Sequence, residues 1–412
     1  MTSLPPSAAG SPAETPAPRI ARGTREYRAV SAAFFSCGFN IFAILYCTQP
    51  VLPRLVQEFD VTPAESSLAL SLTTIVMAVS MLFASSLSEV VGRKPLMLWA
   101  LIAASALTLA LAFATQWSHI LWLRSLAGLA LSGMPAVALA YLAEEMEPGS
   151  VASAVGLYIG GGAVGGMTGR LLAAFLADYG GSWRMAMAAI GLTGLVSAIV
   201  FWKMLAPSRH FTPRAMSPVA LIGSLAGHLR NPGILLLVTA GFLLLGSFMV
   251  LYNYIGFRLQ GAPFYLSQAI AGLVFLTYPI GSFSSAWMGA LAGRHGRGRM
   301  MILCLVITIV GLVLMVPASL VSLALGLAVM TFGFFGAHAI ASGWAPALAE
   351  RDKAQASSLY LLLYYTGGGI AGTLGGVFWS GYGWNGVVLF SGVLMLGTLV
   401  LMLLLWRHAK VQ

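Results

Sequence analysis

Charged residues are scarce in this chain. Only 8% of its 412 residues are Asp, Glu, Lys or Arg, whereas about a quarter is usual for a soluble domain. Because 58% of the residues are hydrophobic, a soluble globular protein is excluded. Backbone polar groups in lipid must be paired within their own segment, so apolar runs of about 20 residues predict membrane-spanning helices. The expected partner of most of the surface is the lipid bilayer.

Cysteine is also rare, and motifs for catalysis are missing from the sequence. The three cysteines, Cys37, Cys47 and Cys304, lie in apolar runs without metal-ligand spacing, so we expect packing residues and no disulfide framework. The sequence has no nucleotide-binding P-loop and no nucleophile or metal constellation in its polar segments. We therefore expect no enzyme, no nucleotide-driven pump, no cofactor and no metal. An integral-membrane enzyme or a channel is the disfavoured alternative from another class of protein.

The basic residues follow a topological pattern. The net charge is +10, which in another context would favour a nucleic-acid partner. Here seventeen Lys and Arg flank one set of alternate polar breaks, whereas only Arg54, Arg184 and Arg258 flank the other set. The positive-inside rule then predicts an inner-membrane protein with both termini in the cytoplasm and no nucleic-acid partner.

The apolar runs fall into two sets of six, separated by a break that contains four prolines and no acidic residue. We predict an all-α integral membrane protein with twelve transmembrane helices in two pseudo-symmetric six-helix bundles. We expect the chain to act as a monomer. The predicted divisions are a disordered cytoplasmic tail (1–28), a first bundle (29–205), a cytoplasmic linker (206–232), a second bundle (233–406) and a cytoplasmic tail (407–412).

Two repeated patterns indicate that the halves are copies of one another. Gly92 and Arg93 recur as Gly296 and Arg297, 204 residues later. Glycines spaced by four also recur, at an offset of 207, and we predict that they pack helices closely. These glycines are Gly161, Gly165, Gly169, Gly368, Gly372 and Gly376. Such duplication is typical of transporter bodies, whose substrate sites lie between the halves near the membrane midplane.

Three short motifs resemble those of the major facilitator superfamily. The loop motif G-x-x-x-D-R-x-G-R-R is approximated by Ser85, Glu89, Gly92, Arg93 and Lys94, with Val90 in place of its first arginine. Arg124 and Gly128 match the motif of the fourth span. The antiporter motif G-P-x-x-G-G is approximated, with glycine in place of proline, by Gly161, Gly162, Gly165 and Gly166. The chain is similar to the twelve-span bacterial drug and sugar efflux branch, which resembles drug:proton antiporters, over roughly residues 29–406.

The resemblance implies a secondary active transporter of the bacterial inner membrane. It would export small neutral or amphipathic solutes (drugs or sugars) by alternating access, in exchange for protons. A proton-independent facilitator or an importer of a small metabolite is the alternative within this class. The family places spans 1, 4, 7 and 10 around a central cavity. The implied cavity residues, with two from span 11, are Asn40, Tyr46, Gln49, Arg124, Tyr252, Asn253, His338, Trp344, Tyr364 and Tyr365.

The loop motif also predicts a gate on the cytoplasmic side. Glu89 ends a span, where the helix dipole is unfavourable for a carboxylate, so we expect it to contact Arg93, Lys94 or the start of another span. The resemblance implies that the contact breaks when the cytoplasmic mouth opens. A solvated loop that only sets topology is the alternative. The residues assigned to this gate are Glu89, Gly92, Arg93, Lys94, Arg294 and Arg297.

Coupling to protons has few candidates, because none of the twelve acidic residues lies in the middle of a span. Arg124 does lie within a span, and the resemblance implies a role in coupling; a side chain that extends to the outer surface is the alternative. His338 lies in mid-span and has a side chain of the type that can change its charge near neutral pH; a packed histidine is the alternative. Arg170 is expected to pack or to pair with Asp178. The coupling candidates are Arg124, Glu144, Glu145 and His338.

Overall fold

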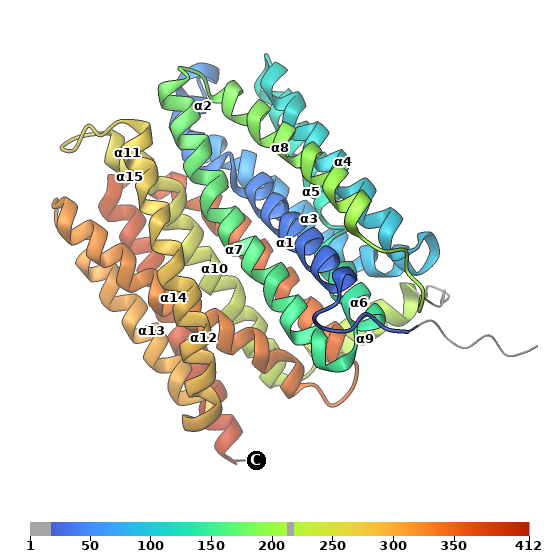
Figure 1. The fold of residues 1–412 in the computed structure, drawn as a ribbon. Coiled ribbons are helices and arrows are strands. Elements are labelled where there is room, and N and C mark those ends of the chain that lie inside the picture. Colours follow the sequence, from blue (N-terminus) through green and yellow to red (C-terminus); the bar gives the residue numbers. More distant parts are fainter. Residues whose placement is uncertain (1–17, 212–217, 412) are drawn as a thin grey trace, which may run out of the picture.

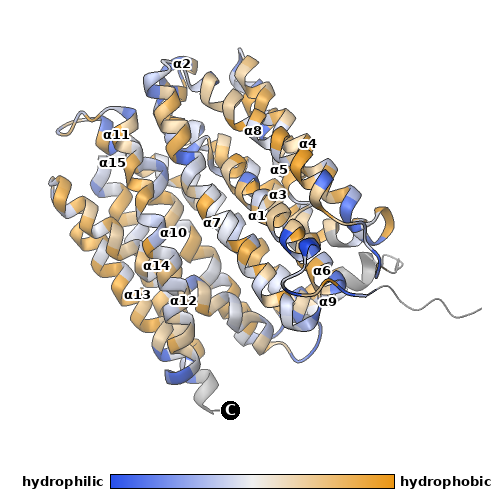
Figure 2. Cartoon of the chain, in the orientation of Figure 1, coloured by the Kyte–Doolittle hydropathy of each residue, from blue (hydrophilic) through white to orange (hydrophobic). Residues whose placement is uncertain are grey.

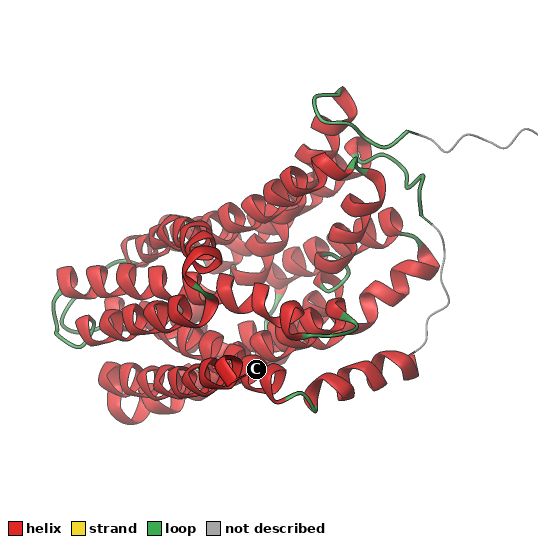
Figure 3. Cartoon of the chain, turned by 90° about the horizontal axis from the view of Figure 1, so that it is seen from below, coloured by secondary structure: helices red, strands yellow, loops and turns green. Residues whose placement is uncertain are grey.

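The structure is a computed structural model that describes residues 18–211 and 218–411. These residues form helices and the turns between them (Figure 1; Figure 3). In the described ranges the strand-like pairing is limited to an isolated parallel bridge between Ile20 and Met146. The predicted all-α fold is therefore confirmed for this part of the chain.

The first half of the chain, here called the N half, runs from α1 to α8. Short turns join its helices, but the closest pairs are not neighbours in sequence: α1 packs chiefly against α7, α3 against α5 and α4 against α8 (Figure 1). The elements are α1 (Arg25–Tyr46), η1 (Gln49–Val51), α2 (Leu52–Phe59), α3 (Pro63–Val91), α4 (Arg93–Ala110), η2 (Leu111–Phe113), α5 (Trp117–Leu131), α6 (Pro135–Glu145), α7 (Pro148–Tyr179) and α8 (Trp183–Met204).

The second half, here called the C half, runs from α10 to α15, and the short helix α9 (Pro218–Leu229) precedes it. Its last element contains two helices that meet at Gly383, where φ is 59°. The elements are α10 (Pro232–Gln260), α11 (Gln268–Gly272), η3 (Leu273–Thr277), α12 (Tyr278–His295), α13 (Arg297–Leu314), α14 (Leu320–Leu348) and α15 (Lys353–Val411).

Ten segments of the described chain are long and apolar enough to cross a membrane. One of them, Lys353–Arg407, holds the two helices that meet at Gly383. α5 and α6 are each shorter than a span, but they follow one another across a brief break before Pro135. With these two adjustments the described residues form twelve spans, six before α9 and six after it.

The same turn occurs at equivalent places in the two halves. Gly92 joins α3 to α4 with φ 96° and ψ 152°, and Gly296 joins α12 to α13 with φ 91° and ψ 136°. Each glycine N–H donates to a carbonyl four residues earlier, on Ser88 at 3.0 Å and on Ala292 at 3.1 Å. Positive φ favours glycine, so the repeat seen in the sequence is a repeated backbone structure.

The outside of the bundle is apolar along the length of the helices. Large side chains lie on it, such as Trp99 (66% exposed), Trp122 (70%) and Leu389 (67%). Figure 2 shows hydrophobic colouring along the helices, with hydrophilic residues gathered towards their ends and in the loops. An apolar surface of this extent fits the hydrocarbon of a bilayer.

The prediction of a disordered tail over residues 1–28 is wrong from residue 18 onward, whereas residues 1–17 lie outside the described ranges. Ile20 is buried, and its N–H donates to the carbonyl of Glu145 at 2.8 Å. α1 already begins at Arg25, because the Thr24 hydroxyl accepts from the N–H of Tyr27 at 3.0 Å and caps the helix. The segment before α1 is therefore fixed to the end of α6.

Two other predicted divisions also change. The linker 206–232 contains the helix α9, while its residues 212–217 lie outside the described ranges. The predicted tail 407–412 continues the last helix of α15 as far as Val411, and residue 412 is outside the described ranges.

The glycine face of α7 lies directly against α1. A Cβ atom added to Gly165 would lie 1.9 Å from the carbonyl oxygen of Phe39, and one added to Gly161 would lie 2.2 Å from that of Phe35. Gly169 faces α1 in the same way, at 2.6 Å from a Cα atom. Only a residue without a side chain permits this approach of two helix backbones.

The glycines predicted in the C half also lie at helix contacts, but they face different neighbours. A Cβ atom on Gly368 would lie 2.7 Å from the Leu245 side chain, and one on Gly376 would lie 2.4 Å from the Cα of Ala64, in the N half. Gly372 lies between these two, with Asn253 at 2.9 Å from its added Cβ atom. The predicted glycine spacing therefore packs α15 against both α10 and α3.

Candidate functional site

Polar side chains join the two halves at one end of the bundle. We call the end with the Gly92 and Gly296 turns the basic end, and the other the opposite end. Near the opposite end, Gln49 Nε2 donates to Asn253 Oδ1 at 2.8 Å. Gln268 accepts from Arg54 Nε at 2.9 Å across the same boundary. These bonds connect the segment after α1 with α10 and α11.

The first part of α3 and the middle of α15 form a second junction. Thr373 Oγ1 donates to the Ser71 hydroxyl at 2.8 Å and lies 3.2 Å from the Ser67 hydroxyl. α7 and α11 form a third junction, where Asp178 Oδ2 accepts from the N–H of Ala269 at 2.9 Å. Because α3 and α11 both begin at the opposite end, the hydrogen bonds between the halves that the structure describes lie towards that end.

The predicted gate residues at the basic end make their described polar contacts within the N half. Arg93 Nη2 lies 2.6 Å from Glu89 and 2.8 Å from Glu144, both through carboxylate oxygens. Lys94 donates to the carbonyl of Leu205, at the end of α8. Gly92 forms the turn between α3 and α4. Glu89 therefore contacts Arg93, as expected, and not the start of α15.

The equivalent basic residues of the C half lie on its surface. Arg294 is in the last turn of α12 and Arg297 begins α13, and both are exposed. The two copies of the turn thus differ in their surroundings, because Glu89 has Gly293 as its counterpart at the offset of 204 residues.

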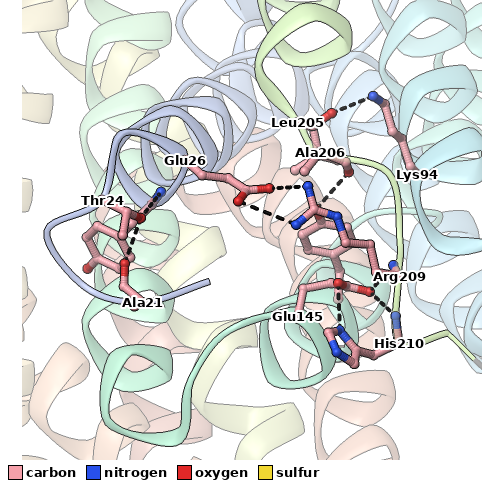
Figure 4. Close-up of polar contacts among 11 residues, drawn as sticks. Ala21, Thr24, Glu26, Lys94, Glu145, Leu205, Ala206, Arg209 and His210 are labelled. Carbon is pink, nitrogen blue, oxygen red and sulfur yellow. Dashed lines mark hydrogen bonds and ion pairs between the residues drawn. The ribbon is translucent and has the colours of Figure 1, made fainter. Parts of the chain in front are cut away.

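Glu145 ties the linker to the N half instead of facing the middle of the bundle. Its Oε1 atom accepts from the N–H groups of Arg209 at 2.7 Å and His210 at 2.8 Å (Figure 4). Its Oε2 atom lies 3.0 Å from His210 Nδ1, and Arg209 in turn pairs with Glu26 at 2.8 Å. The side chain is 1% exposed. Glu144 and Glu145, both predicted for coupling, therefore have basic or backbone partners at the basic end.

Arg124 is held by backbone carbonyls of two other helices, and its predicted cavity role stays a prediction. Its side chain is fully buried. It donates to the carbonyls of Ile44 at 3.0 Å, Leu45 at 2.6 Å and Ala69 at 2.8 Å. The first two carbonyls belong to the last turn of α1, where carbonyls have no partner within the helix and carry the negative end of the dipole. Arg124 therefore caps α1 and ties it to α3.

Arg170 of α7 is the buried cation that faces the boundary between the halves. Its Nε atom donates to Gln49 Oε1 at 2.6 Å, and Nη1 donates to the carbonyl of Gly166 at 2.7 Å. The guanidinium lies over the Tyr46 ring at 3.9 Å and over the Tyr278 ring at 4.7 Å. The expected pairing with Asp178 is absent from the described contacts, because Asp178 instead contacts α11.

A belt of aromatic rings in contact, some stacked and some edge to face, runs from this arginine through the C half. Tyr278 contacts Tyr252 with 5.5 Å between ring centroids, and Phe248 bridges Tyr252 at 4.4 Å and Phe334 at 3.9 Å. The belt continues through the half-buried His338 and the two tyrosines of α15. The centroid distances are 6.4 Å for Phe334–His338, 4.2 Å for His338–Tyr364 and 5.4 Å for Tyr364–Tyr365.

The structure thus brings some predicted cavity residues together and leaves others apart. Tyr46, Gln49 and Asn253 gather around Arg170, and the tyrosines and His338 continue from it as the aromatic belt. Among the described contacts, Asn40 donates to the carbonyl of Ser36 at 2.9 Å, and the buried Trp344 has no ring contact with the belt. A narrow pocket lined by Gln49, Tyr252 and Phe275, from both halves, adjoins the cluster.

Arg170 was predicted to pack or to pair with Asp178, and the structure places it against Gln49 and aromatic rings. Arg124 and Arg170 are both arginines within spans, and the motif of the fourth span directed attention to Arg124. The signal that separates them is the acceptor that each one finds on other helices, which the sequence does not display. Within the described residues, no group of three or more His, Cys, Asp or Glu side chains could hold a metal ion.

Known proteins resemble this chain along nearly its full length. It is 46% identical over 387 residues to the "Uncharacterized MFS-type transporter YybF" of Bacillus subtilis (strain 168), which covers 94% of each chain. It is also 46% identical over 376 residues to the "Inner membrane transport protein YnfM" of Escherichia coli (strain K12), which covers 91% of this chain and 90% of that one.

The fold is similar to that of solved membrane transporters. The crystal structure of a bacterial homolog to the human lysosomal transporter Spinster, in an inward-facing and unoccupied conformation, superposes with a TM-score of 0.76. That match has 16% sequence identity and covers 93% of this chain and 96% of that chain, so it supports the fold alone. The sequence profile of the Major Facilitator Superfamily matches residues 34–277 and 261–412. The chain is therefore a membrane-embedded transporter that belongs to the major facilitator superfamily.

Proposed function

We propose that this protein exports a small amphipathic solute, of the drug or sugar type or a similar metabolite, across the inner membrane in exchange for protons. Its two halves would rock about a central site and open it to each side in turn. The observation that carries this proposal is the one-sided junction between the halves. Their described hydrogen bonds lie towards the opposite end, as in a transporter open at the basic end.

The distribution of bases supports an orientation with the basic end and both termini in the cytoplasm. The basic end carries Arg93, Lys94, Arg294 and Arg297, together with the linker. The opposite end carries few bases, among them Arg54. Under the positive-inside rule a central site that opens at the basic end would face the cytoplasm, where an exporter loads its solute.

We further propose that the basic end closes during the cycle. Arg93 is almost fully buried between Glu89 and Glu144, which holds the ends of α3, α4 and α6 as one unit. Closure would bring this unit onto the start of α15 or onto Arg294 and Arg297. The opposite junction would then have to separate, because rigid halves exchange one set of contacts for the other.

His338 is the best-placed group for proton coupling. It lies within α14 in the aromatic belt, half-buried, with Nδ1 at 3.0 Å from the Tyr360 hydroxyl. None of the twelve carboxylates of the chain lies in mid-span, and Glu144 and Glu145 are already held by the basic end. Histidine is the side chain whose charge changes most readily near neutral pH.

A proton-independent facilitator is the second candidate, and the lack of a mid-span carboxylate specifically favours it. A facilitator, which would also serve as an importer, needs the rocking motion and the central site but no group that cycles its proton. The two candidates differ in one measurable property, the response of transport to a pH gradient.

Transport into inverted membrane vesicles tests both candidates. A screen of drugs, sugars and organic acids for thermal stabilisation of the purified protein would first identify a ligand. We expect uptake of that ligand to fall when nigericin collapses the pH gradient, and to fall by at least about tenfold in His338→Ala. Uptake that is unchanged by nigericin would favour the facilitator. Vesicles that take up none of the stabilising ligands would overturn both candidates.

A further inference from the structure

One N–H group of the buried arginine between the halves has no partner. Arg170 is fully buried, with Nε on Gln49 and Nη1 on the carbonyl of Gly166. Its Nη2 atom is buried as well and has no hydrogen-bond acceptor among the described residues. Buried donors in native structures are almost always paired, so an unpaired one points to a ligand that the site is built to receive.

The positive charge of Arg170 is also uncompensated among its described contacts. Asp178, on the same helix, lies 4.0 Å from Arg54 Nη2 and accepts from α11. The neighbours of the guanidinium are instead the rings of Tyr46, Tyr278 and Phe275, the last at 5.2 Å. Aromatic faces stabilise a cation only in part. A buried cation within a membrane span otherwise requires an anionic or carbonyl partner.

The amides beside Arg170 are oriented by it, and this leaves a second free donor. Arginine can only donate hydrogen bonds, so Gln49 must present Oε1 to it. Gln49 Nε2 then faces Asn253, which must accept through Oδ1, at 2.8 Å. Within the part of the chain that the structure describes, the Nδ2 group of Asn253 is left buried without a partner, and so is the hydroxyl of Tyr278. Donors from both halves therefore exceed acceptors around Arg170.

We propose that Arg170 binds the carboxylate of an amphipathic organic anion whose apolar or aromatic body packs against Tyr46, Tyr278 and the aromatic belt. The inference rests on the proposed transport function and narrows its substrate class. A carboxylate has two oxygens and suits the forked donors of a guanidinium. A neutral drug or sugar would leave the charge of Arg170 as uncompensated as it is now.

Binding at Arg170 would act directly on the junction between the halves. Gln49 bonds both to Arg170 and, across the boundary, to Asn253. An anion that takes the guanidinium competes with Gln49 and weakens the bridge. Tyr46 and Tyr278 are each 8% exposed and cover Arg170, so their rings must turn for a ligand to enter. Loading would thus favour separation of the opposite end.

Thermal unfolding of the full-length protein in detergent tests the binding without any variant. The ligands are benzoate, phenylacetate and cinnamate at millimolar concentration, each compared with its own neutral amide. We expect at least one carboxylate to raise the Tm saturably and its amide to give less than about a tenth of that affinity. Equal shifts for acid and amide, or no shift for any of the acids, would overturn the proposal.

Two variants then locate the site. Arg170→Gln is expected to weaken the apparent affinity for the best carboxylate by at least about tenfold. Arg54→Gln is the matched control, because it removes another arginine and another bond between the halves without changing the rings of Tyr46 and Tyr278 around Arg170. We expect it to keep the carboxylate shift. If both variants lowered the affinity for the carboxylate equally, Arg170 would only stabilise the junction between the halves and would not bind the ligand. Arg170→Lys serves if the glutamine variant does not fold, with an intermediate affinity expected.

The outcome separates this inference from the proposed function. Carboxylate affinity that is unchanged in Arg170→Gln, together with vesicle uptake of another solute, would refute the carboxylate site and leave the transporter proposal standing. Carboxylate binding that depends on Arg170, without any uptake in vesicles, would support the carboxylate site and refute the proposed transport function.

Discussion

At the scale of single residues, two buried arginines differ in how many of their guanidinium nitrogens have a hydrogen-bond acceptor. Arg124 has a carbonyl acceptor for each of three nitrogens, two of them in the last turn of α1. Arg170 has acceptors for two nitrogens and lacks one for the third. A fully satisfied cation has a structural role, whereas an incompletely satisfied one is available to a ligand. The residues have the same chemistry, and only their neighbours distinguish them.

Replacing Arg124 should therefore affect stability more than chemistry. We expect Arg124→Met to lower stability by about 3 kcal/mol, because three buried carbonyls lose a charged donor. The measurement is the Tm of the purified protein, with Arg258→Met as a control, since Arg258 donates to the carbonyl of Ala262 in an exposed loop. An Arg124→Met protein with normal Tm and no transport would instead support the coupling role that the sequence motif implied.

At the scale of helices, the glycine spacing predicts close packing of α7 and α15 but not the register in which their glycines correspond. The predicted offset of 207 pairs Gly161 with Gly368. However, it is Gly367 whose added Cβ atom would meet the carbonyl of Phe242 on α10, at 2.1 Å, as that of Gly161 meets Phe35 on α1. The equivalent faces of α7 and α15 are thus 206 residues apart. Both runs contain adjacent glycines, so the sequence alone allows either register.

Alanine at two glycines of α7 should have opposite effects. Gly165→Ala places a Cβ atom 1.9 Å from the Phe39 carbonyl and should lower stability by about 2 kcal/mol, through forced separation of α1 and α7. Gly160→Ala meets no atom within 4 Å and should raise stability by up to about 1 kcal/mol, because alanine is the better helix former. Thermal unfolding of the two variants side by side checks this, and equal Tm values would contradict the proposed packing.

At the scale of the whole molecule, the described hydrogen bonds between the two halves lie near one end. Gln49, Ser67 and Asp178 bond across the boundary near the opposite end. The Arg93 cluster remains within the N half. A transporter that works by alternating access needs such a junction to be breakable, and a small set of side-chain hydrogen bonds near one end satisfies that need.

A disulfide across the junction should stop the proposed cycle. The hydroxyls of Ser67 and Thr373 lie 3.2 Å apart, so Ser67→Cys with Thr373→Cys should form a bond on oxidation. We expect oxidation to abolish vesicle uptake of the identified ligand and dithiothreitol to restore it. The single variants are the controls, and the native cysteines Cys37, Cys47 and Cys304 are buried. Full uptake by the cross-linked protein would show that this junction does not open.

The sequence by itself determined the properties that depend on composition and local pattern. Low charge and long apolar runs predict twelve spans, because lipid requires each span to pair its own backbone groups. The recurrence of Gly92 and Arg93 as Gly296 and Arg297 was visible in the sequence, whereas the positive φ of the two glycines was seen only in the structure. The prediction of disorder was wrong at residues 18–28, because Ile20 pairs with the end of α6, a segment that is distant in the sequence.

Only the tertiary structure decided which polar residues meet. Arg124 finds its acceptors on α1 and α3, whereas Arg170 finds one on the segment after α1. These acceptors lie 55 to 121 residues away in the sequence. Gln49 and Asn253 meet because the two halves pack face to face, 204 residues apart. Buried charges and amides take their roles from partners on other helices, and no periodicity along one helix specifies those partners. The site at Arg170 is for this reason a property of the fold.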